Sequence, residues 1–236
     1  MKEARKRTRE LFLARMSKDA MGPYESPRGE WDENEKEYLP FFLSHVGNGK
    51  QILDLAGGYA KAAPNLLQDG NSVVLADLSL PSLRRGREAL ASRDVQFVRL
   101  DMNTELPFVD EAFDGIWFSQ AFEYVPPEKR MRFLRALRRT VKEKGIVFFS
   151  AEGLSNMSAW LSYLKGYVYW KLLRRAPIVW GECIYRLDLP DYKGWHYHSL
   201  VLSRLIEKDL RAAGFEILKS KNLGKSEYYT YVLRAV

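Results

Sequence analysis

Between residues 50 and 150 the chain alternates short apolar runs, rich in β-branched side chains, with longer segments of helical periodicity. Such alternation is typical of parallel strands joined by right-handed crossovers, which place helices on both faces of one sheet. Two later runs are separated only by a short polar loop and so predict an antiparallel hairpin. We therefore expect an α/β fold: a doubly wound, mostly parallel seven-stranded sheet that ends in an antiparallel hairpin. The predicted strands are residues 51–55, 72–76, 95–100, 113–118, 145–150, 215–220 and 228–234.

Apolar side chains at three- to four-residue spacing predict the helices, and the 236 residues are read as one domain. The predicted helices are residues 2–16, 32–45, 62–68, 80–91, 128–142 and 200–213, the last ending at Gly214. We expect residues 1–48 to be an N-terminal helical segment and lid, 49–153 the ligand-binding core, 154–198 a cap insertion, and 199–236 the closing helix and hairpin.

The net charge indicates which kinds of partner the protein could bind, and the cysteine content indicates its cellular compartment. There are 37 Lys and Arg against 30 Asp and Glu, so the net charge is +7 and the pI about 9.3, which favours polyanionic or membrane-surface partners. The one cysteine, Cys183, excludes an internal disulfide and is typical of a reducing compartment. No run of about 18 apolar residues occurs, and the N-terminal apolar stretch is too short for a signal peptide, so we expect a cytoplasmic protein.

Small and acidic residues gather where the predicted strands end. The first strand runs into Ala56, Gly57 and Gly58, whose small side chains let a ligand approach the backbone. The second and third strands end at Asp77 and Asp101. Open α/β sheets bind ligands beyond the carboxyl ends of their strands. Two carboxylates there suit a ligand rich in hydroxyl and amino donors, such as an adenosine.

Five segments resemble, in order and spacing, the motifs of the class I S-adenosylmethionine-dependent methyltransferases, especially their type 11 group. They are ILDLAGGYA, VVLADLS, VRLDMNTELPF, FDGIWFSQAFEYV and VKEKGIVFFS. The resemblance covers residues 51–150 and the closing hairpin, and it implies a Rossmann-like fold, S-adenosylmethionine as cofactor and S-adenosylhomocysteine as product. A nicotinamide dehydrogenase, the natural alternative on this fold, needs glycines spaced G-x-G-x-x-G, which this loop lacks.

The resemblance implies cofactor contacts at four strand ends. Asp54 would organise the loop and reach the methionine amino group, Asp77 would accept from both ribose hydroxyls, and Asp101 would take the adenine amino group. The alternative role for each aspartate is to cap the helix or turn that follows. The family usually has glycine at the positions of Ala56 and Ala60, and we expect alanine to be mild at position 56, which need not adopt a positive φ. The full set is Asp54, Ala56, Gly57, Gly58, Asp77, Leu78, Asp101, Met102, Ser119 and Gln120.

Methyl transfer from a sulfonium depends mainly on orientation, and a general base is needed only for a weakly acidic hydroxyl or a protonated amine. The candidate bases are Glu123, which follows the fourth strand where many relatives carry His, and His196 and His198 at the end of the insertion. An exposed carboxylate at a helix start is an equal alternative for Glu123. A turn or capping role is favoured for the two histidines. We expect no metal site, because no third ligand lies near them in sequence.

The insertion at residues 154–198 holds ten Tyr or Trp and no Phe, and in relatives this stretch commonly forms a substrate-facing cap. Apolar side chains recur at helical spacing between residues 157 and 172, with Lys and Arg around them. We favour a small, hydrophobic or aromatic acceptor and leave the methylated atom open. The tentative substrate contacts are Tyr24, Tyr124, Trp160 and Tyr197, and the linker with Tyr24 and Arg28 is expected to close over the cofactor.

Three alternatives stay open on the sequence. The cationic, apolar helix could rest on a membrane surface and deliver a lipid-like acceptor. The basic N-terminal helix and the aromatic cap could clamp RNA, such as tRNA, through phosphate contacts and base stacking. The altered glycine loop could instead belong to a non-catalytic, cofactor-binding partner subunit. The sequence predicts no oligomeric state.

Overall fold

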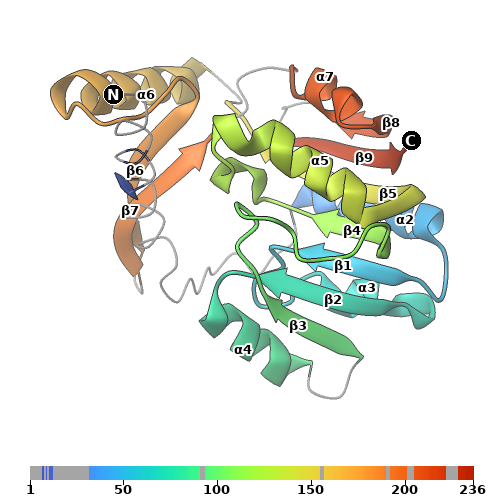
Figure 1. The fold of residues 1–236 in the computed structure, drawn as a ribbon. Coiled ribbons are helices and arrows are strands. Elements are labelled where there is room, and N and C mark those ends of the chain that lie inside the picture. The colour runs from blue at the N-terminus through green and yellow to red at the C-terminus, as the bar shows by residue number, and fades with distance from the viewer. Residues whose placement is uncertain are drawn as a thin grey trace.

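A computed structural model describes residues 7, 9, 11–12, 32–90, 94–154, 157–189, 192–200, 205–221 and 228–236. Its main sheet consists of β1 (Gln51–Leu55), β2 (Ser72–Asp77), β3 (Val95–Arg99), β4 (Phe113–Phe118), β5 (Val141–Glu152), β8 (Phe215–Lys221) and β9 (Tyr228–Ala235). The seven strands lie in the order β3-β2-β1-β4-β5-β9-β8 (Figure 1). Neighbouring strands are parallel except that β9 is antiparallel to both β5 and β8. The predicted sheet and its closing hairpin are confirmed.

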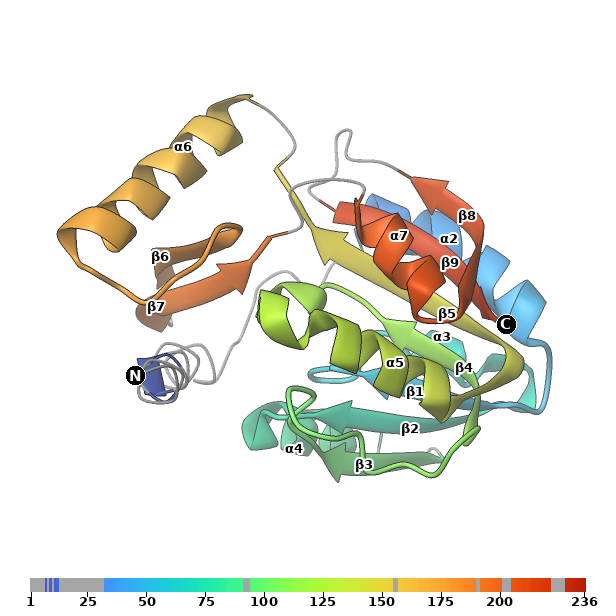
Figure 2. The same ribbon diagram turned by 45° about the horizontal axis from the view of Figure 1, so that its top comes forward.

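Helices cover both faces of this sheet (Figures 1 and 2). One face carries α2 (Glu33–Val46), α3 (Ala63–Leu66) and α4 (Leu80–Ala89). The other carries α5 (Arg130–Thr140) and α7 (Leu205–Ala212). Each face of the sheet carries its own apolar core, and successive side chains of β1 point to opposite faces. Ile52 therefore packs with α2, α3 and α4, and Leu53 with α5 and α7. Both faces of the central strands are therefore buried, as their continuous apolar runs predict.

Several helices are shorter than predicted. The helix expected at residues 62–68 is α3 followed by the 3₁₀ turn η1 (Gln68–Gly70). The helix expected at 128–142 starts after the 3₁₀ turn η3 (Pro127–Lys129) and ends at Thr140, because the fully buried Val141 already pairs with β4 as the first residue of β5. The helix expected at 2–16 lies mostly outside the described residues, and the one expected at 200–213 is described from Leu205.

The insertion forms a separate cap, defined here as residues 157–199. It contains α6 (Met157–Val168), one π-helical turn η4 (Tyr169–Leu173), and an antiparallel hairpin of β6 (Glu182–Leu189) and β7 (Tyr192–Ser199). In Figures 1 and 2 the cap lies beyond the carboxyl ends of the parallel strands of the sheet. The sequence predicted the helix of this insertion but not its hairpin. Across the described ranges, no helix is both long and apolar enough to cross a bilayer.

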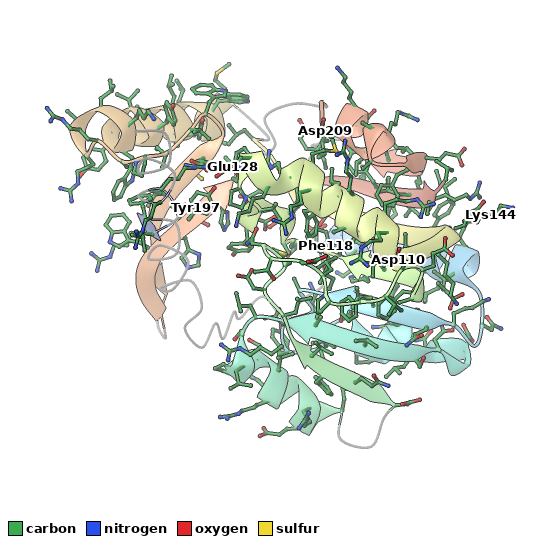
Figure 3. All side chains as sticks on the ribbon, viewed as in Figure 1. Asp110, Phe118, Glu128, Lys144, Tyr197 and Asp209 are labelled. Atoms are coloured by element: carbon green, nitrogen blue, oxygen red, sulfur yellow. The ribbon has the colours of Figure 1, made fainter. Side chains whose placement is uncertain are left out.

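A third apolar cluster and one arginine hold the cap in place. Trp170 of η4 packs with residues of the hairpin, and its indole Nε1 donates to the Ile184 carbonyl at 2.9 Å. Arg9 donates to both carboxylate oxygens of the fully buried Glu182 and, at 2.9 and 3.0 Å, to Glu128 beside the start of α5. Figure 3 shows Glu128 on the side of the domain that faces the cap. Arg9 thus joins the N-terminal segment, the cap and the core.

Candidate functional site

The loop after β1 has little room for side chains. A Cβ on Gly57 would lie 2.6–2.9 Å from the carboxyl atoms of Asp54, so any other residue there would have to displace this carboxylate. Ala56 and Gly58 both have positive φ, 58° and 56°. Alanine was expected to be mild at position 56 because that position need not adopt a positive φ, but it does adopt one, and its amide donates to the Ala76 carbonyl at 2.7 Å. The left-handed conformation costs an alanine about 1–2 kcal/mol, and such strain concentrates where backbones are shaped around ligands.

Asp54 at the end of β1 is an uncompensated buried acid. Its side chain is 2% exposed, and Oδ2 has no hydrogen-bond partner among the described residues. Burial, reinforced by the negative charge of Asp77, raises the pKa of Asp54 from 3.8 to about 7. A carboxylate buried in this way is costly unless a cation or hydrogen-bond donor approaches it, so this strand end is suited to a positively charged ligand.

Asp77 and Asp101 end the next two strands, and each also caps the chain that follows. The Asp77 carboxylate accepts from the Gly58 amide at 2.9 Å and from the Ser79 amide at 2.7 Å, and so ties the glycine loop to the start of α4. Burial outweighs these hydrogen bonds and raises the pKa of Asp77. Asp101 accepts from the Asn103 amide at 2.9 Å. The capping role and a place at the strand ends are therefore combined in the same side chains.

The remaining predicted cofactor residues line the same edge. Leu78 follows Asp77, and its carbonyl accepts from Arg99. Met102 is half-buried against the core on the α5 face. Gln120 follows β4 with φ of 51°, and its amide donates to the hydroxyl of Ser150 at 2.7 Å. The turn at Gln120 thus redirects the chain across the end of β5.

Two charged residues at this edge were not predicted from the sequence. Glu35 on α2 is 1% exposed and accepts from the Ser119 hydroxyl and from Lys61 Nζ, each at 2.7 Å. The sequence signal for Glu35 was the capping box with Asp32, which predicts only a helix start. Here the same carboxylate also reaches a strand end. With Asp54 it places two buried acids and one lysine beside the glycine loop.

A second titratable cluster lies at the ends of β4 and β5. Glu123, in the 3₁₀ turn η2 (Phe122–Tyr124), is 2% exposed, which excludes the exposed carboxylate considered from the sequence. Burial, then the charge of Glu152, raises the pKa of Glu123 to about 7, while His198 acts in the opposite direction. His198 Nδ1 lies 2.5 Å from Oε2 of Glu152. Although burial disfavours the imidazolium, Glu152 outweighs it and raises the pKa of His198.

Tyrosine and histidine rings complete this cluster. The Tyr124 hydroxyl lies 3.2 Å from Nε2 of His198, and the Tyr185 hydroxyl of β6 lies at the same distance from it. The His196 ring stacks on Tyr185 at a centroid distance of 5.7 Å. Burial and the charge of His198 lower the pKa of His196 to about 4. The turn or capping role favoured for the histidines is wrong, because both lie within β7 on the face that Tyr185 shares.

Of the three other tentative substrate contacts, Tyr197 and Trp160 lie away from this cluster and Tyr24 is outside the described residues. Tyr197 is on the opposite face of β7 from the histidines, 2% exposed in the third apolar cluster, and its hydroxyl donates to Glu182 at 2.5 Å (Figure 3). Trp160 is on α6, edge-on to Tyr163. Tyr24, like Arg28 of the expected lid, lies outside the described residues. The structure thus brings Glu123, Tyr124 and His198 together, whereas the hydroxyl of Tyr197 is bound to Glu182 on the other face of the hairpin.

Comparison with known proteins gives the family. A family model described as "Methyltransferase domain" matches residues 52–145. A solved S-adenosylmethionine-dependent methyltransferase from Methanosarcina mazei superimposes with a TM-score of 0.68 at 17% identity, over 84% of this chain and 97% of that one. The ubiquinone/menaquinone biosynthesis C-methyltransferase UbiE of Coxiella burnetii is 34% identical over 183 residues, 74% of this chain and 70% of the relative. The chain belongs to the S-adenosylmethionine-dependent methyltransferases.

Two further relatives of this methyltransferase differ in coverage. The demethylmenaquinone methyltransferase of Clavibacter sepedonicus is 41% identical over 93 residues, 38% of each protein. The 1,6-didemethyltoxoflavin-N1-methyltransferase of Burkholderia thailandensis, crystallised with 1,6-didemethyltoxoflavin and S-adenosylhomocysteine, has a TM-score of 0.60 at 16% identity, over 97% of this chain and 87% of that one. The similarity to the Burkholderia thailandensis enzyme covers nearly the whole chain but, at 16% identity, is a similarity of fold alone.

The residues of this methyltransferase fit its cofactor. S-adenosylmethionine has cationic sulfonium and ammonium groups and the donors of an adenosine. The strand ends carry the buried Asp54 and the half-buried Asp77, and the buried Glu35 of α2 lies beside them. Burial, then the charge of Asp77, raises the pKa of Asp54 although Lys61 opposes them, so a cationic ligand would offset the desolvation of this carboxylate. When bound, the cofactor supplies an electrophilic methyl group.

Proposed function

We propose that this methyltransferase methylates a small apolar or aromatic acceptor that carries a weakly acidic hydroxyl. The acceptor would lie between the ends of β4 and β5 and the inner face of the β6–β7 hairpin. The observation that carries the proposal is the buried Glu123, whose pKa of about 7 suits a general base near neutral pH. An acceptor that is already nucleophilic would not require such a group.

The chain's own groups have separate parts in this proposal. Glu123 takes the acceptor proton, and the imidazolium of His198, held by Glu152, stabilises the carboxylate before the proton arrives. The rings of Tyr124 and Tyr185 offer apolar faces with hydroxyl tips, which suit a flat acceptor. We assign the cofactor to the strand ends, with Asp54, Asp77 and Asp101 in the roles that the family resemblance implies.

The names of the relatives support a small acceptor. The Coxiella burnetii relative is named for ubiquinone/menaquinone biosynthesis, the Clavibacter sepedonicus relative for demethylmenaquinone, and the Burkholderia thailandensis structure for 1,6-didemethyltoxoflavin. All three names denote small organic molecules rather than nucleic acid. Identity to these relatives is modest, so the exact acceptor follows from the assay below and not from their names.

Two measurements test the proposal. Calorimetric titration with S-adenosylhomocysteine should give binding that Asp77→Ala abolishes. Methyl transfer to a panel of phenols, hydroquinones and amines should then favour the hydroxyl compounds, and Glu123→Gln should lower kcat by roughly 10²–10⁴-fold without changing cofactor binding. Glu105→Gln, which removes an exposed carboxylate of the same type, should leave both unchanged. Methylation of bulk RNA with a steep salt dependence, and of no small hydroxyl compound, would refute the proposal.

A further inference from the structure

The cap carries an exposed apolar surface that the catalytic site does not use. Its side chains recur at positions 157, 161, 164, 168 and 172, the spacing of one helix face. They are 42–73% exposed, far more than side chains of this type usually are on a helix packed in a domain. We call them the α6 face: Met157, Leu161, Leu164, Val168 and Leu172.

The opposite side of the helix accounts for its folding without this face. Tyr163 is buried, and its hydroxyl accepts from the Gly181 amide at 2.7 Å. Trp170, also buried, donates to β6 and packs edge-on against Trp195 of β7. α6 is therefore anchored to the hairpin through its inner side, and the α6 face is left outward. In Figure 2 the helix lies at the outer end of the cap, away from the layers of the main domain.

The charged residues of the segment that carries the α6 face, residues 157–181, have one sign. Residues 157–181 contain no Asp or Glu but four cations, Lys165, Lys171, Arg174 and Arg175, all exposed. The Lys171 ammonium contacts the Ile178 carbonyl, and the Arg174 guanidinium lies 5.9 Å from the Trp170 ring centroid. Leu173 and Trp180, 73% and 54% exposed, extend the apolar surface among these cations. Within residues 157–181 the apolar stripe therefore has only Lys and Arg as charged neighbours in sequence, which is the composition of helices that lie in the headgroup region of anionic membranes.

We propose that the α6 face docks on an anionic membrane surface, with α6 parallel to the bilayer plane. A second copy of the chain fits the surface less well, because a symmetric contact would bring the four cations of each copy against each other. In the membrane-bound state the apolar side chains enter the acyl boundary and the cations meet lipid phosphates. Docking would place the hairpin that carries His198 next to the bilayer, from which a lipophilic acceptor could enter; this last step rests on the proposed function.

Vesicle sedimentation tests the docking with the whole 236-residue chain and no acceptor. The protein should pellet with vesicles of phosphatidylcholine and phosphatidylglycerol, weakly with phosphatidylcholine alone, and less as salt is raised. Leu161→Glu with Leu172→Glu should weaken binding by roughly 100-fold, since two apolar anchors become anions. Arg174→Gln with Arg175→Gln should weaken binding to the anionic vesicles by about tenfold and leave the weak binding to neutral ones.

The matched control is Val109→Glu, which changes a side chain that is 75% exposed but remote from the cap. It should bind vesicles as the wild type does, and all variants should bind S-adenosylhomocysteine equally, which shows that they are folded. Absence of binding to anionic vesicles at low salt would overturn the proposal, as would equal binding by the double leucine variant. A dimer that this variant dissociates, without vesicle binding, would assign the α6 face to a second copy. Because no acceptor is present, failure here is distinct from failure of the proposed function.

Discussion

Replacement of Asp54 by asparagine should stabilise the cofactor-free protein at alkaline pH and at the same time weaken cofactor binding. In the native state burial raises the pKa of Asp54 from 3.8 to about 7. Between these values the native protein holds a proton that the unfolded chain has released, so stability falls as pH rises. Asparagine keeps the shape of the side chain but has no charge to desolvate.

The size of the effect follows from the two pKa values. A pKa shift from 3.8 to about 7 lowers the stability of the native state by about 4 kcal/mol at a pH where Asp54 is ionised in both the native and the unfolded state. At pH 5 the cost is about 1.6 kcal/mol and at pH 8 it is almost complete, so the free energy of unfolding of Asp54→Asn relative to wild type should rise by about 3 kcal/mol between them. Because the variant loses a charged hydrogen-bond partner, its affinity for S-adenosylhomocysteine should fall by about 10–100-fold.

Urea unfolding at pH 5 and pH 8, with and without S-adenosylhomocysteine, measures both effects. Asp114→Asn is the control of opposite sign, because Lys142, the Gln51 amide and Lys50 together outweigh burial there and lower the pKa of Asp114. Its carboxylate stabilises the fold above the unfolded-state pKa of 3.8, and that contribution is lost only as pH falls below this value. Asp114→Asn should therefore be destabilising to a similar extent at pH 5 and at pH 8. A stability difference between Asp54→Asn and wild type that is the same at both pH values would refute the reasoning.

Three other substitutions test separate parts of the site and cap. Gly57→Ala should lower the free energy of unfolding by about 1–3 kcal/mol and weaken S-adenosylhomocysteine in a calorimetric titration, because the added methyl group meets a buried carboxylate. His198→Asn should move the rising limb of the kcat–pH profile to higher pH, since the positive charge that lowers the pKa of Glu123 is gone; an unmoved limb would exclude Glu123 as the titrating group. Arg9→Ala leaves Glu182 buried without its cation and should cost about 3–5 kcal/mol, seen as faster protease cleavage within the cap at unchanged core stability.

The parts of the fold that the sequence predicted are those with a local periodic signal. Buried apolar runs such as residues 145–150 predict strands wherever they occur. Because the carboxyl ends of parallel strands meet at one edge of a sheet, the proximity of Asp54 and Asp77 could be predicted from the sequence. The positive φ of Ala56 could not be predicted from the sequence, because it depends on a hydrogen bond to the neighbouring strand. The same holds for the beginning of β5, which is set by its pairing with β4.

The features of the site that the sequence did not predict are contacts between residues far apart in the chain. Glu35 meets Ser119 across 84 residues, and Tyr124 meets His198 across 74. No window of sequence contains both members of either pair. For the histidines a signal was present: alternate spacing through Tyr197 is the period of a strand, and the opposite environments of Tyr197 and His198 follow from it. The turn interpretation failed because the partner strand β6 was not recognised.

The place of β9 between β5 and β8 has a consequence for how the chain is made. During synthesis the first five strands leave the ribosome well before β9 does, and the whole cap lies between β5 and the strand that it must pair with. Until then β5 presents an unpaired backbone edge, with the apolar side chains of residues 146–149 on both of its faces. Such edges recruit other strands, so a nascent or truncated chain that stops before residue 228 should aggregate rather than pause as a folded intermediate. Holdase chaperones that cover this edge are expected to matter most while the cap is being translated.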